Sequence, residues 1–349
     1  MFATDHLIRP VRLGPLALAG NLVLAPMHHR THLAMRLLAR RAGAALAHTE
    51  MATPEDLLGR SGPRKGGNLL ATSTEDRPLG VQILPREHGP LVEAIALLAE
   101  RRAGDLVDLN FACPSQRVAG SGHGAAMLLE PEEAVRLVET AVRAGLRHGV
   151  ARPGRGEAGP LPVTLKMRCG YTDSADHRDR AMELARGAVA AGAVAITLHA
   201  RTAVQQYHGQ ADWTVIRQWA EQLPVPVFGS GDLRSPEAVL EMLRQTGCAG
   251  ASIARGAVGA PWIFRQTLEL AARGSYAPVT PAERARALME HYEGLVLQYG
   301  PQGGLRLFCQ VGRMYARSIG GAAEARVAIQ NARSRDDILL IIERWFGGA

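Results

Sequence analysis

The sequence is poor in cysteine. Its four cysteines, Cys113, Cys169, Cys248 and Cys309, lie far apart, and no Cys-x-x-Cys pair or Cys/His zinc spacing occurs. This distribution argues against a disulfide framework and is compatible with a single reactive thiol in a reducing cytoplasm. No apolar run approaches the ~18 residues that a membrane-spanning helix needs. Residues 1–10 also lack the apolar core and cleavage site of a secretory signal. We therefore expect a cytoplasmic protein with no membrane partner.

Lysine is scarcer still. Only Lys65 and Lys166 occur among 40 basic residues, which exceed 33 acidic residues and give a net charge of +7. Lys166 lies in an apolar segment, where an ammonium group is costly unless it is paired. Because nearly all other basic residues of the chain are arginines, a lysine at this position indicates that a compact point charge is required there. The alternative is a strand-end residue whose charged end reaches solvent. We favour the functional interpretation, because Lys65 lies in a polar loop.

The length and the pattern of apolar segments predict an α/β protein. The chain has 349 residues, of which 47% are hydrophobic and 21% are charged, and this composition excludes wholesale disorder. Segments with helical periodicity alternate with short apolar runs, several of them nearly continuous, as in strands buried on both faces. Eight such strands predict a TIM (β/α)8 barrel, and an open doubly wound sheet is the alternative. The predicted strands are 22–26, 44–48, 79–84, 106–110, 162–168, 194–199, 226–229 and 250–254.

Three further segments complete the predicted organisation. Residues 13–24 suggest a small hairpin around Gly20-Asn21 that plugs the bottom of the barrel. Residues 153–162 are rich in glycine and proline and indicate an enlarged surface loop. From Pro281 to Phe346 the chain reads as helices only, with breaks at Gly303-Gly304 and Gly320-Gly321. We therefore predict a barrel domain over residues 1–270 and a small all-α helical domain over residues 271–349.

Polar or glycine-rich clusters follow almost every predicted strand. In a TIM barrel the active site lies at the carboxyl ends of the strands, so these clusters are expected to meet in one site. They comprise Pro26-Met27-His28, Thr49-Glu50, Gln82, Asn110 with Cys113, Lys166 with Arg168, His199 with Arg201, the turn 229–232, and Ala254-Arg255-Gly256.

Cys113 is the candidate reactive thiol. Most free cysteines are small, buried apolar residues, and this is the alternative interpretation of Cys113. However, Pro114 and the glycines of segment 120–124 indicate a shaped, mobile active-site loop beside it. These glycines do not form a dinucleotide-binding motif, because they do not directly follow a strand. The other three cysteines are interpreted as small, buried apolar residues.

Two turns predict a phosphate site. Ser230, Gly231 and Asp232 follow the seventh strand, and Ala254 and Arg255 follow the eighth. TIM barrels commonly hold a phosphate there through backbone amides. Either turn alone could be an ordinary tight turn. His199 ends the sixth strand on the same rim, where cofactor contact is favoured over a structural role.

Three histidines, His28, His29 and His32, follow the first strand. His28 and His32 have the i, i+4 spacing that a metal could use. No carboxylate or third ligand is evident in the sequence, so we expect no metal site.

Together these motifs resemble the tRNA-dihydrouridine synthases, from about Ala25 to the end of the chain. The resemblance is carried by Asn110-Phe-Ala-Cys-Pro-Ser-Gln-Arg-Val, Gly122-His-Gly-Ala-Ala-Met-Leu-Leu, Lys166-Met-Arg, His199-Ala-Arg-Thr and Tyr207-His-Gly-Gln-Ala-Asp-Trp213. It implies an FMN enzyme that uses NADPH to reduce the C5–C6 double bond of particular uridines in tRNA. Hydride would reach C6 from the reduced flavin, and Cys113 would protonate C5.

The resemblance also implies roles for single residues. Pro26, Met27 and His28 match the segment along the flavin, and Gln82, Lys166 and His199 match flavin contacts. The phosphate-side loops match Ser230, Gly231, Asp232, Ala254 and Arg255. Asn110, Arg168 and Arg201 are expected near the substrate or the flavin. The sequence departs from the family pattern at four places. His28-His29 stands where a small residue followed by glycine is usual, and Ala112 stands where glycine is usual. Ser230 replaces the usual asparagine, and Ala254 replaces a residue that is often glycine.

Basic residues are concentrated near the end of the chain. Six arginines and one acid, Glu324, occur from residue 305 to residue 335. Arg306, Arg313 and Arg317 project within about 40° of one another on a helical wheel. This nearly unopposed charge predicts tRNA binding by the helical domain, and an amphipathic surface helix is the alternative.

Two other functions fit the sequence. One is a flavin dehydrogenase of a small pyrimidine or enone, in which the helical region only packs on the barrel. The other is an RNA-binding paralogue without redox chemistry, which the changes at His28-His29 and Ala112 would permit. We expect a monomer.

Overall fold

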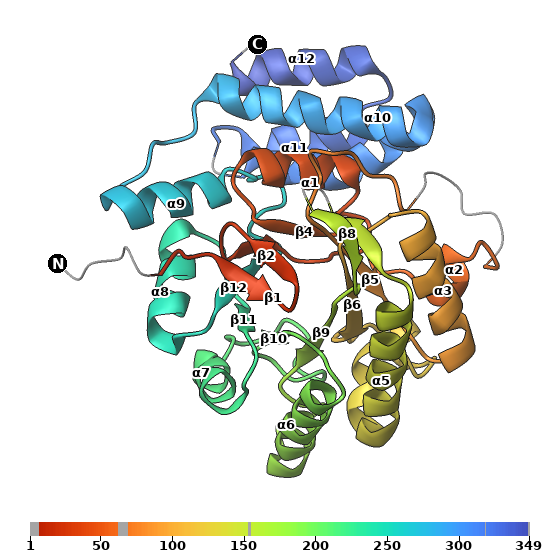
Figure 1. The fold of residues 1–349 in the computed structure, drawn as a ribbon. Helices are drawn as coiled ribbons and strands as arrows, with labels where there is room; N and C mark the ends of the chain where they lie inside the picture. Colours follow the sequence, from red (N-terminus) through yellow and green to blue (C-terminus); the bar gives the residue numbers. More distant parts are fainter. Residues whose placement is uncertain (1–6, 62–68, 153–154, 318, 348–349) are drawn as a thin grey trace.

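The fold is a closed barrel of eight parallel strands, followed by a helical region (Figure 1). The computed structural model describes residues 7–61, 69–152, 155–317 and 319–347, so Lys65 lies outside the described residues. Pairing of β12 with β3 closes the barrel, with Ala251 opposite Leu22. All the predicted strands occur, which confirms the TIM barrel. They are β3 (Leu22–Leu24), β4 (Leu46–His48), β5 (Leu79–Ile83), β6 (Leu106–Phe111), β9 (Val163–Arg168), β10 (Ile196–His199), β11 (Val227–Ser230) and β12 (Gly250–Ile253).

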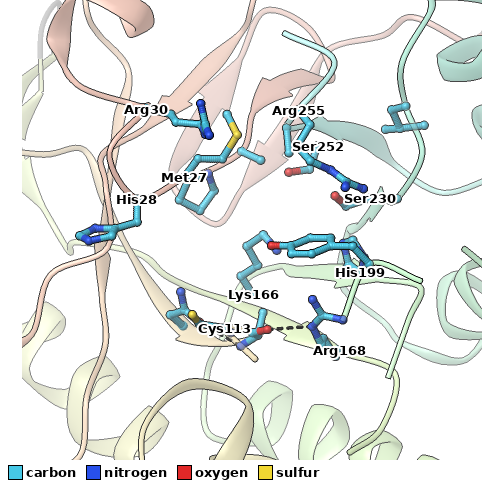
Figure 2. Close-up of a pocket in the computed structure, with 18 of the residues that line it drawn as sticks. Met27, His28, Arg30, Cys113, Lys166, Arg168, His199, Ser230, Ser252 and Arg255 are labelled. Atoms are coloured by element: carbon cyan, nitrogen blue, oxygen red, sulfur yellow. Dashed lines mark hydrogen bonds between the residues drawn. The ribbon is translucent and has the colours of Figure 1, made fainter. Parts of the chain in front are cut away.

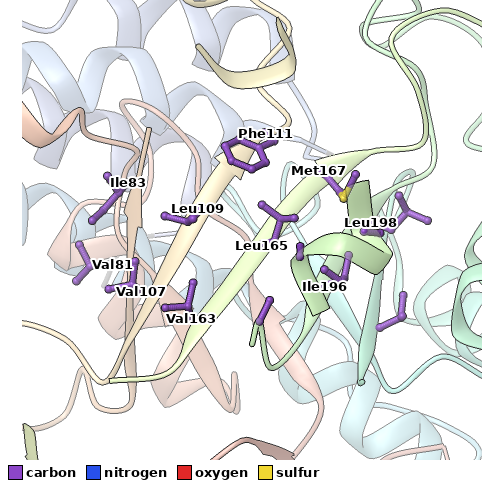
Figure 3. Packing of buried hydrophobic residues seen from close by; sticks show 14 of the residues in the cluster. Val81, Ile83, Val107, Leu109, Phe111, Val163, Leu165, Met167, Ile196 and Leu198 are labelled. Atoms are coloured by element: carbon purple, nitrogen blue, oxygen red, sulfur yellow. The ribbon is translucent and has the colours of Figure 1, made fainter. Parts of the chain in front are cut away.

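The strands form because each can bury both of its faces. Side chains alternate along a strand, so Val107, Leu109 and Phe111 share one face of β6, and they pack with residues of β5, β9 and β10 in the main apolar core (Figure 3). Asp108 and Asn110 share the other face and are also buried. The outer face therefore stabilises the fold, and the inner face carries polar groups.

Helices cover the outside of the barrel (Figure 1). Ser174, Asp212 and Ser235 accept hydrogen bonds from the first turns of α6, α7 and α8, and Gly247 ends α8 in the left-handed conformation. The covering helices are α1 (Leu33–Arg41), α2 (Pro54–Leu57), α3 (His88–Glu100), α5 (Pro131–Arg147), α6 (Ala175–Ala190), α7 (Trp213–Gln222), α8 (Pro236–Thr246) and α9 (Ile263–Arg273). A short helix, α4 (Gln116–Ala119), and the 3₁₀ helix η1 (Gly124–Leu129) follow β6.

The long connection between β4 and β5 is fastened by a buried ion pair. Arg36 of α1 donates to Asp76 at 2.8 Å, and both side chains are almost fully buried. Arg36 also donates to the backbone oxygens of Thr31 and Ala71. This network anchors Ala71 and Asp76, in the part of the connection that precedes β5, to α1.

A hairpin closes the bottom of the barrel, but its turn is not at the predicted position. Strands β1 (Val11–Leu13) and β2 (Leu16–Leu18) pair across Gly14, which has a φ of +55°. Their apolar side chains pack against Val23, Leu46, Leu106, Ala195 and Phe228. The prediction of a turn at Gly20-Asn21 is wrong, because the Asn21 amide donates to the backbone oxygens of Leu7 and Ala249 and anchors the start of β3.

The insertion before β9 also differs from its prediction as a loop. Residues on either side of 153–154 form the antiparallel pair β7 (Val150–Arg152) and β8 (Arg155–Gly159). No helix in the described part of the chain has the length and apolarity to cross a membrane.

The region after Gly274 is helical, as predicted. It contains α10 (Pro281–Val311), the 3₁₀ helix η2 (Gly312–Ala316), α11 (Ala322–Asn331) and α12 (Arg335–Phe346). The predicted break at Gly303-Gly304 is wrong: α10 kinks at Gly300, which has a φ of +74° and precedes Pro301. Gly304 instead permits close packing, because a Cβ there would lie 2.5 Å from Val296 Cα. The domain division at residues 270 and 271 stays a prediction.

Two buried histidines join the barrel to the helical region. His32 Nδ1 accepts from the backbone N–H of Met35, so its Nε2 carries the proton and donates to His291 Nε2 at 3.3 Å. His291 Nδ1 then donates to the Tyr315 hydroxyl at 3.1 Å. Burial lowers the pKa of His291 to about 3, and burial and His291 hold the pKa of His32 well below its usual range. Both rings are therefore neutral in the folded protein.

These histidines predict a loss of stability in acid. The unfolded chain binds protons below its histidine pKa of about 6.5, whereas His291 in the folded protein binds one only near pH 3. Stability therefore falls as the pH drops from about 6.5 towards 3, and each histidine contributes about 1.3 kcal/mol of loss between pH 7 and pH 5.5. Urea unfolding at the two pH values measures this, and His291→Gln should reduce the loss by about 1.3 kcal/mol. An unchanged loss in that variant would contradict the assignment.

Candidate active site

A cavity of about 360 Å³ opens at the carboxyl end of the barrel (Figure 2). Residues from the ends of all the barrel strands line it, and its volume lies in the range of small-molecule sites. The structure brings together here Cys113, Asn110, Arg168, Pro26, Met27, His28, Gln82, Lys166, His199, Ser230, Gly231, Asp232, Ala254 and Arg255.

The inner wall is a connected set of polar side chains. Gln82 donates to Asp108 at 2.7 Å and accepts from the Asn110 amide at 2.8 Å. Asp108 also accepts from Thr164 at 2.8 Å. The Asn110 side-chain oxygen accepts from the backbone N–H groups of Ala112 and Cys113. This network fixes the turn that presents Cys113 to the cavity.

Several polar groups of the wall have no hydrogen-bond partner among the described residues. They are the Lys166 ammonium group and the buried His199 Nε2 and Ser252 Oγ atoms. Burial and the nearby Arg168 lower the pKa of Lys166 to about 8. Buried polar groups are normally paired, so this wall is suited to a polar ligand.

Arg168 ties two loops of the site together. Its buried guanidinium donates to the backbone oxygens of Ala112 at 2.8 Å (Figure 2), Thr202 at 2.7 Å and Gln206 at 2.8 Å. Arg201 is also buried, but it does not line the cavity. It donates to Asp232 at 2.6 Å and to the backbone oxygens of His208 and Gly209. The geometry makes Arg201 a support for Asp232. That Arg201 lies near the substrate or the flavin stays a prediction.

The turns after β11 and β12 pack on each other. Gly231 has a φ of +130°, and a Cβ on it would lie 2.6 Å from Ala211 Cβ. A Cβ on Gly256 would lie 2.1 Å from the backbone oxygen of Leu233. Gly231 therefore permits contact with the loop after β10, and Gly256 permits the close approach of the turns after β11 and β12. Arg255 lies in the second of these turns, 4.4 Å from the centre of the Tyr207 ring.

Of the four cysteines, only Cys113 lines the cavity. Its Sγ lies 3.5 Å from the Ser115 hydroxyl. Gly124, with a φ of +61°, lets η1 pack against this turn, since a Cβ there would lie 2.7 Å from the Cys113 oxygen. Burial raises the pKa of Cys169 to about 11 and also raises the pKa values of Cys248 and Cys309.

A family model described as dihydrouridine synthase (Dus) matches residues 23–342. The chain belongs to the dihydrouridine synthase family. The tRNA-dihydrouridine synthase B of Pseudomonas aeruginosa is 32% identical over 337 residues, which cover 96% of each chain. A probable tRNA-dihydrouridine synthase of Treponema pallidum is 37% identical over 291 residues, or 80% of each chain.

Solved structures show the same fold at much lower identity. The old yellow enzyme from Trypanosoma cruzi has a TM-score of 0.53 and 11% identity, and the match covers 81% of this chain and 96% of that one. Histamine dehydrogenase from Rhizobium sp. 4-9 has a TM-score of 0.55 and 14% identity, over 88% of this chain and 51% of that one. These likenesses support the barrel.

Several cavity residues were not predicted. Met51 and Ser252 carry no distinctive sequence signal beyond their place near strand ends. Tyr207 belongs to a motif of the family, but its return to the cavity depends on the loop that Arg168 holds. Arg30 and Arg234 also line the cavity. Because arginine is frequent throughout this chain, its occurrence at these two positions did not indicate a site.

The histidines after β3 are arranged differently from the i, i+4 pair considered in the sequence. His32 caps α1 and faces His291, because residues 25–32 are not helical. His28 and His29 instead stack at 3.8 Å between ring centroids, and Glu50 lies beside them. The absence of a carboxylate, inferred from the sequence, is therefore wrong, since the possible ligand atoms of His28, His29 and Glu50 lie within 4.8 Å of one another. That no metal binds stays a prediction.

Arg306, Arg313 and Arg317, which were predicted to share one face of a helix, do not lie on one helix. The α-helix ends at Val311, so Arg313 and Arg317 do not continue the helical wheel that contains Arg306. Arg306 lines a second cavity of about 400 Å³ with His28, His29 and Glu50. Arg317 instead reaches the turn after β12 and donates to the backbone oxygen of Arg255 at 3.2 Å.

Arg168→Met should destabilise the protein and loosen both loops. The variant leaves three backbone oxygens without their charged donor, at a cost of about 3 kcal/mol. Urea unfolding measures the loss, and hydrogen exchange should become faster at residues 112–113 and 202–206. Arg217→Met, on the exposed side of α7, is the matched control, with an expected change within about 0.5 kcal/mol. Equal stability of the two variants would show that other contacts hold the loops.

Proposed function

We propose that this protein reduces particular uridines in tRNA to 5,6-dihydrouridine, with FMN as cofactor and NADPH as reductant. The observation that carries the proposal is the Cys113 thiol in a cavity that also presents His199 Nε2 and Ser252 Oγ, two buried polar atoms without a hydrogen-bond partner among the described residues. The curated relatives named above, which are called tRNA-dihydrouridine synthases, support the substrate. We expect the protein to act as a monomer in the cytoplasm.

The residues of the cavity fit a flavin mononucleotide. Gln82, Lys166 and His199 would contact the ring system, beside Pro26, Met27 and His28. The phosphate would bind at the turns of Ser230, Gly231, Asp232, Ala254 and Arg255, since TIM barrels commonly hold a phosphate there through backbone amides. The close approach of the two turns at Gly256 supports this assignment. When bound, reduced FMN supplies the hydride for C6 of the uracil ring.

Lys166 suits the polar edge of such a ring. With a pKa of about 8 it carries a proton at neutral pH, although burial disfavours its charge. Asp108, on the neighbouring strand, favours the charged form. The unpaired ammonium group can therefore donate a hydrogen bond to a ligand oxygen or nitrogen, which supports the proposed contact.

Cys113 supplies the proton for C5. A thiol is mostly protonated at neutral pH, yet its ordinary pKa of about 8.5 is low enough for it to donate. Asn110 fixes the backbone of Cys113, and the half-buried thiol opens to the cavity. The Ser115 hydroxyl, 3.5 Å from Sγ, is placed to pass a replacement proton from solvent to the thiol.

The substrate must leave the RNA stack to reach this thiol. Asn110 and Arg168 shape the loops on the substrate side of the cavity. Arg306, Arg313 and Arg317 are then available for the RNA backbone, and all three belong to the helical region. Positive charge facing phosphates supplies most of the sequence-independent affinity for nucleic acid.

Dihydrouridine formation in unmodified tRNA, incubated with the purified protein, FMN and NADPH, tests the function. We expect the wild-type protein to form product and Cys113→Ala to be slower by about 10²–10⁴-fold, because general acid catalysis is lost. Flavin reduction by NADPH without tRNA should be unchanged in this variant. Cys309→Ala, in the helical region, is the control and should retain activity.

Two outcomes would contradict the proposal. A flavin-loaded wild-type protein that forms no dihydrouridine in tRNA would indicate another RNA or a small-molecule substrate. Full activity of Cys113→Ala would remove the thiol from its role as proton donor.

A further inference from the structure

Arg30 is an unpaired cation on the wall of the cavity. It follows β3, is half-buried, and lies across the cavity from Cys113 (Figure 2). Its guanidinium makes no hydrogen bond or ion pair with any residue that the structure describes, although Arg36 and Arg41 nearby in sequence are both paired with acids. Placing an unpaired charge in a half-buried position is unfavourable. The chain therefore holds Arg30 there without a gain from internal pairing.

Arginines of the helical region approach the side of the cavity that Arg30 lines, where Arg317 donates to the backbone oxygen of Arg255. Burial and Arg313 lower the pKa of Arg30. Burial, Arg234, Arg30, Arg255 and Arg326 lower the pKa of Arg317. Asp232, the carboxylate among the described residues that line the cavity, is bound by Arg201 at 2.6 Å and lies 3.8 Å from Arg255. Like charges thus converge on one side of the cavity, and an anion would relieve their repulsion.

The two arginines of the helical region are held in place by local contacts. The Arg313 terminal nitrogen donates to Gln330 at 3.1 Å, and its buried Nε has no partner among the described residues. Arg317 donates to the backbone oxygen of Arg255 at 3.2 Å. Gly259 allows this approach, because a Cβ on it would lie 2.3 Å from the backbone carbon of Met314. The barrel and the helical region together therefore position these charges.

We infer that Arg30, Arg313 and Arg317 bind one backbone phosphate of the RNA beside the cavity. The inference rests on the proposed function. The planar guanidinium group matches phosphate with paired N–H donors, and contacts to phosphate fix the register of a nucleic acid without reading its sequence. Such a contact holds the backbone of the nucleotide that must leave the stack. The flavin phosphate is assigned to the turns after β11 and β12, so it does not account for Arg30.

The test compares Arg30→Gln with Arg217→Gln, which removes the same charge from the exposed side of α7. Binding of unmodified tRNA is measured over a range of salt concentrations with the flavin-loaded protein. For Arg30→Gln we expect about tenfold weaker binding at physiological salt. The slope of log Kd against log salt should become shallower by about 0.7–0.9. Arg30→Lys keeps the charge and should restore most of the slope, and Arg217→Gln should resemble the wild type.

Further readouts distinguish phosphate binding from a structural role. Because Arg30 is repelled by its neighbours, Arg30→Gln should keep or raise the melting temperature, whereas loss of a structural residue would lower it. Flavin content and the rate of flavin reduction by NADPH should stay at the wild-type values. A fall in flavin content would assign the arginine to the flavin phosphate, and slower reduction with an unchanged tRNA slope would assign it to NADPH. Either result would overturn the inference.

The outcomes also separate this inference from the proposed function. If the wild-type protein forms dihydrouridine but Arg30→Gln keeps the full salt slope, only the phosphate site is wrong. If the wild-type protein neither binds tRNA nor modifies it, both are wrong. Arg313→Gln and Arg317→Gln test the same phosphate site independently. Each should make the slope of log Kd for tRNA against log salt shallower.

Discussion

Each strand of this barrel has to satisfy two environments at once, because neighbouring side chains point to opposite faces. On β6, Val107, Leu109 and Phe111 pack beneath the helices, and Asp108 and Asn110 face the barrel interior. The polar residues remain buried only because they pair with one another, as Asp108 does with Gln82 and Thr164. Sliding the strand by one residue would place carboxylate and amide groups in the apolar core. The packing of the outer face therefore fixes the register of the site.

This constraint explains how the network around Asn110 reaches the reactive thiol. The side chain of Asn110 is held by Gln82, which stands on the neighbouring strand, and its oxygen binds the backbone of the turn at Cys113. Arg168, on the strand at the other side, holds the same turn through Ala112. The position of the thiol is thus determined by buried strands on both sides. A loop alone would position it less precisely.

The strands and the residues at their ends could be predicted from sequence, because local apolar patterning defines the strands and the barrel topology brings their ends together. The prediction failed where placement depends on distant partners. Glu50 meets His28 and His29 only after β3 and β4 pair, and His32 faces a residue more than 250 positions away. The helical wheel failed because the α-helix that contains Arg306 ends at Val311 and a 3₁₀ turn follows it. Arg30 carried no signal, since arginine is common everywhere in this chain.

The two ends of the barrel differ in what they contribute to stability. At the bottom, the β1–β2 hairpin closes the barrel with apolar side chains such as Leu13 and Leu18. At the top, the charged ends of Lys166 and Arg30 line the cavity and make no hydrogen bond or ion pair with a described residue. Such groups cost stability in the folded protein. Apolar packing at the bottom offsets that cost. The open end can then keep polar groups unpaired, and these are the groups that a ligand can bind.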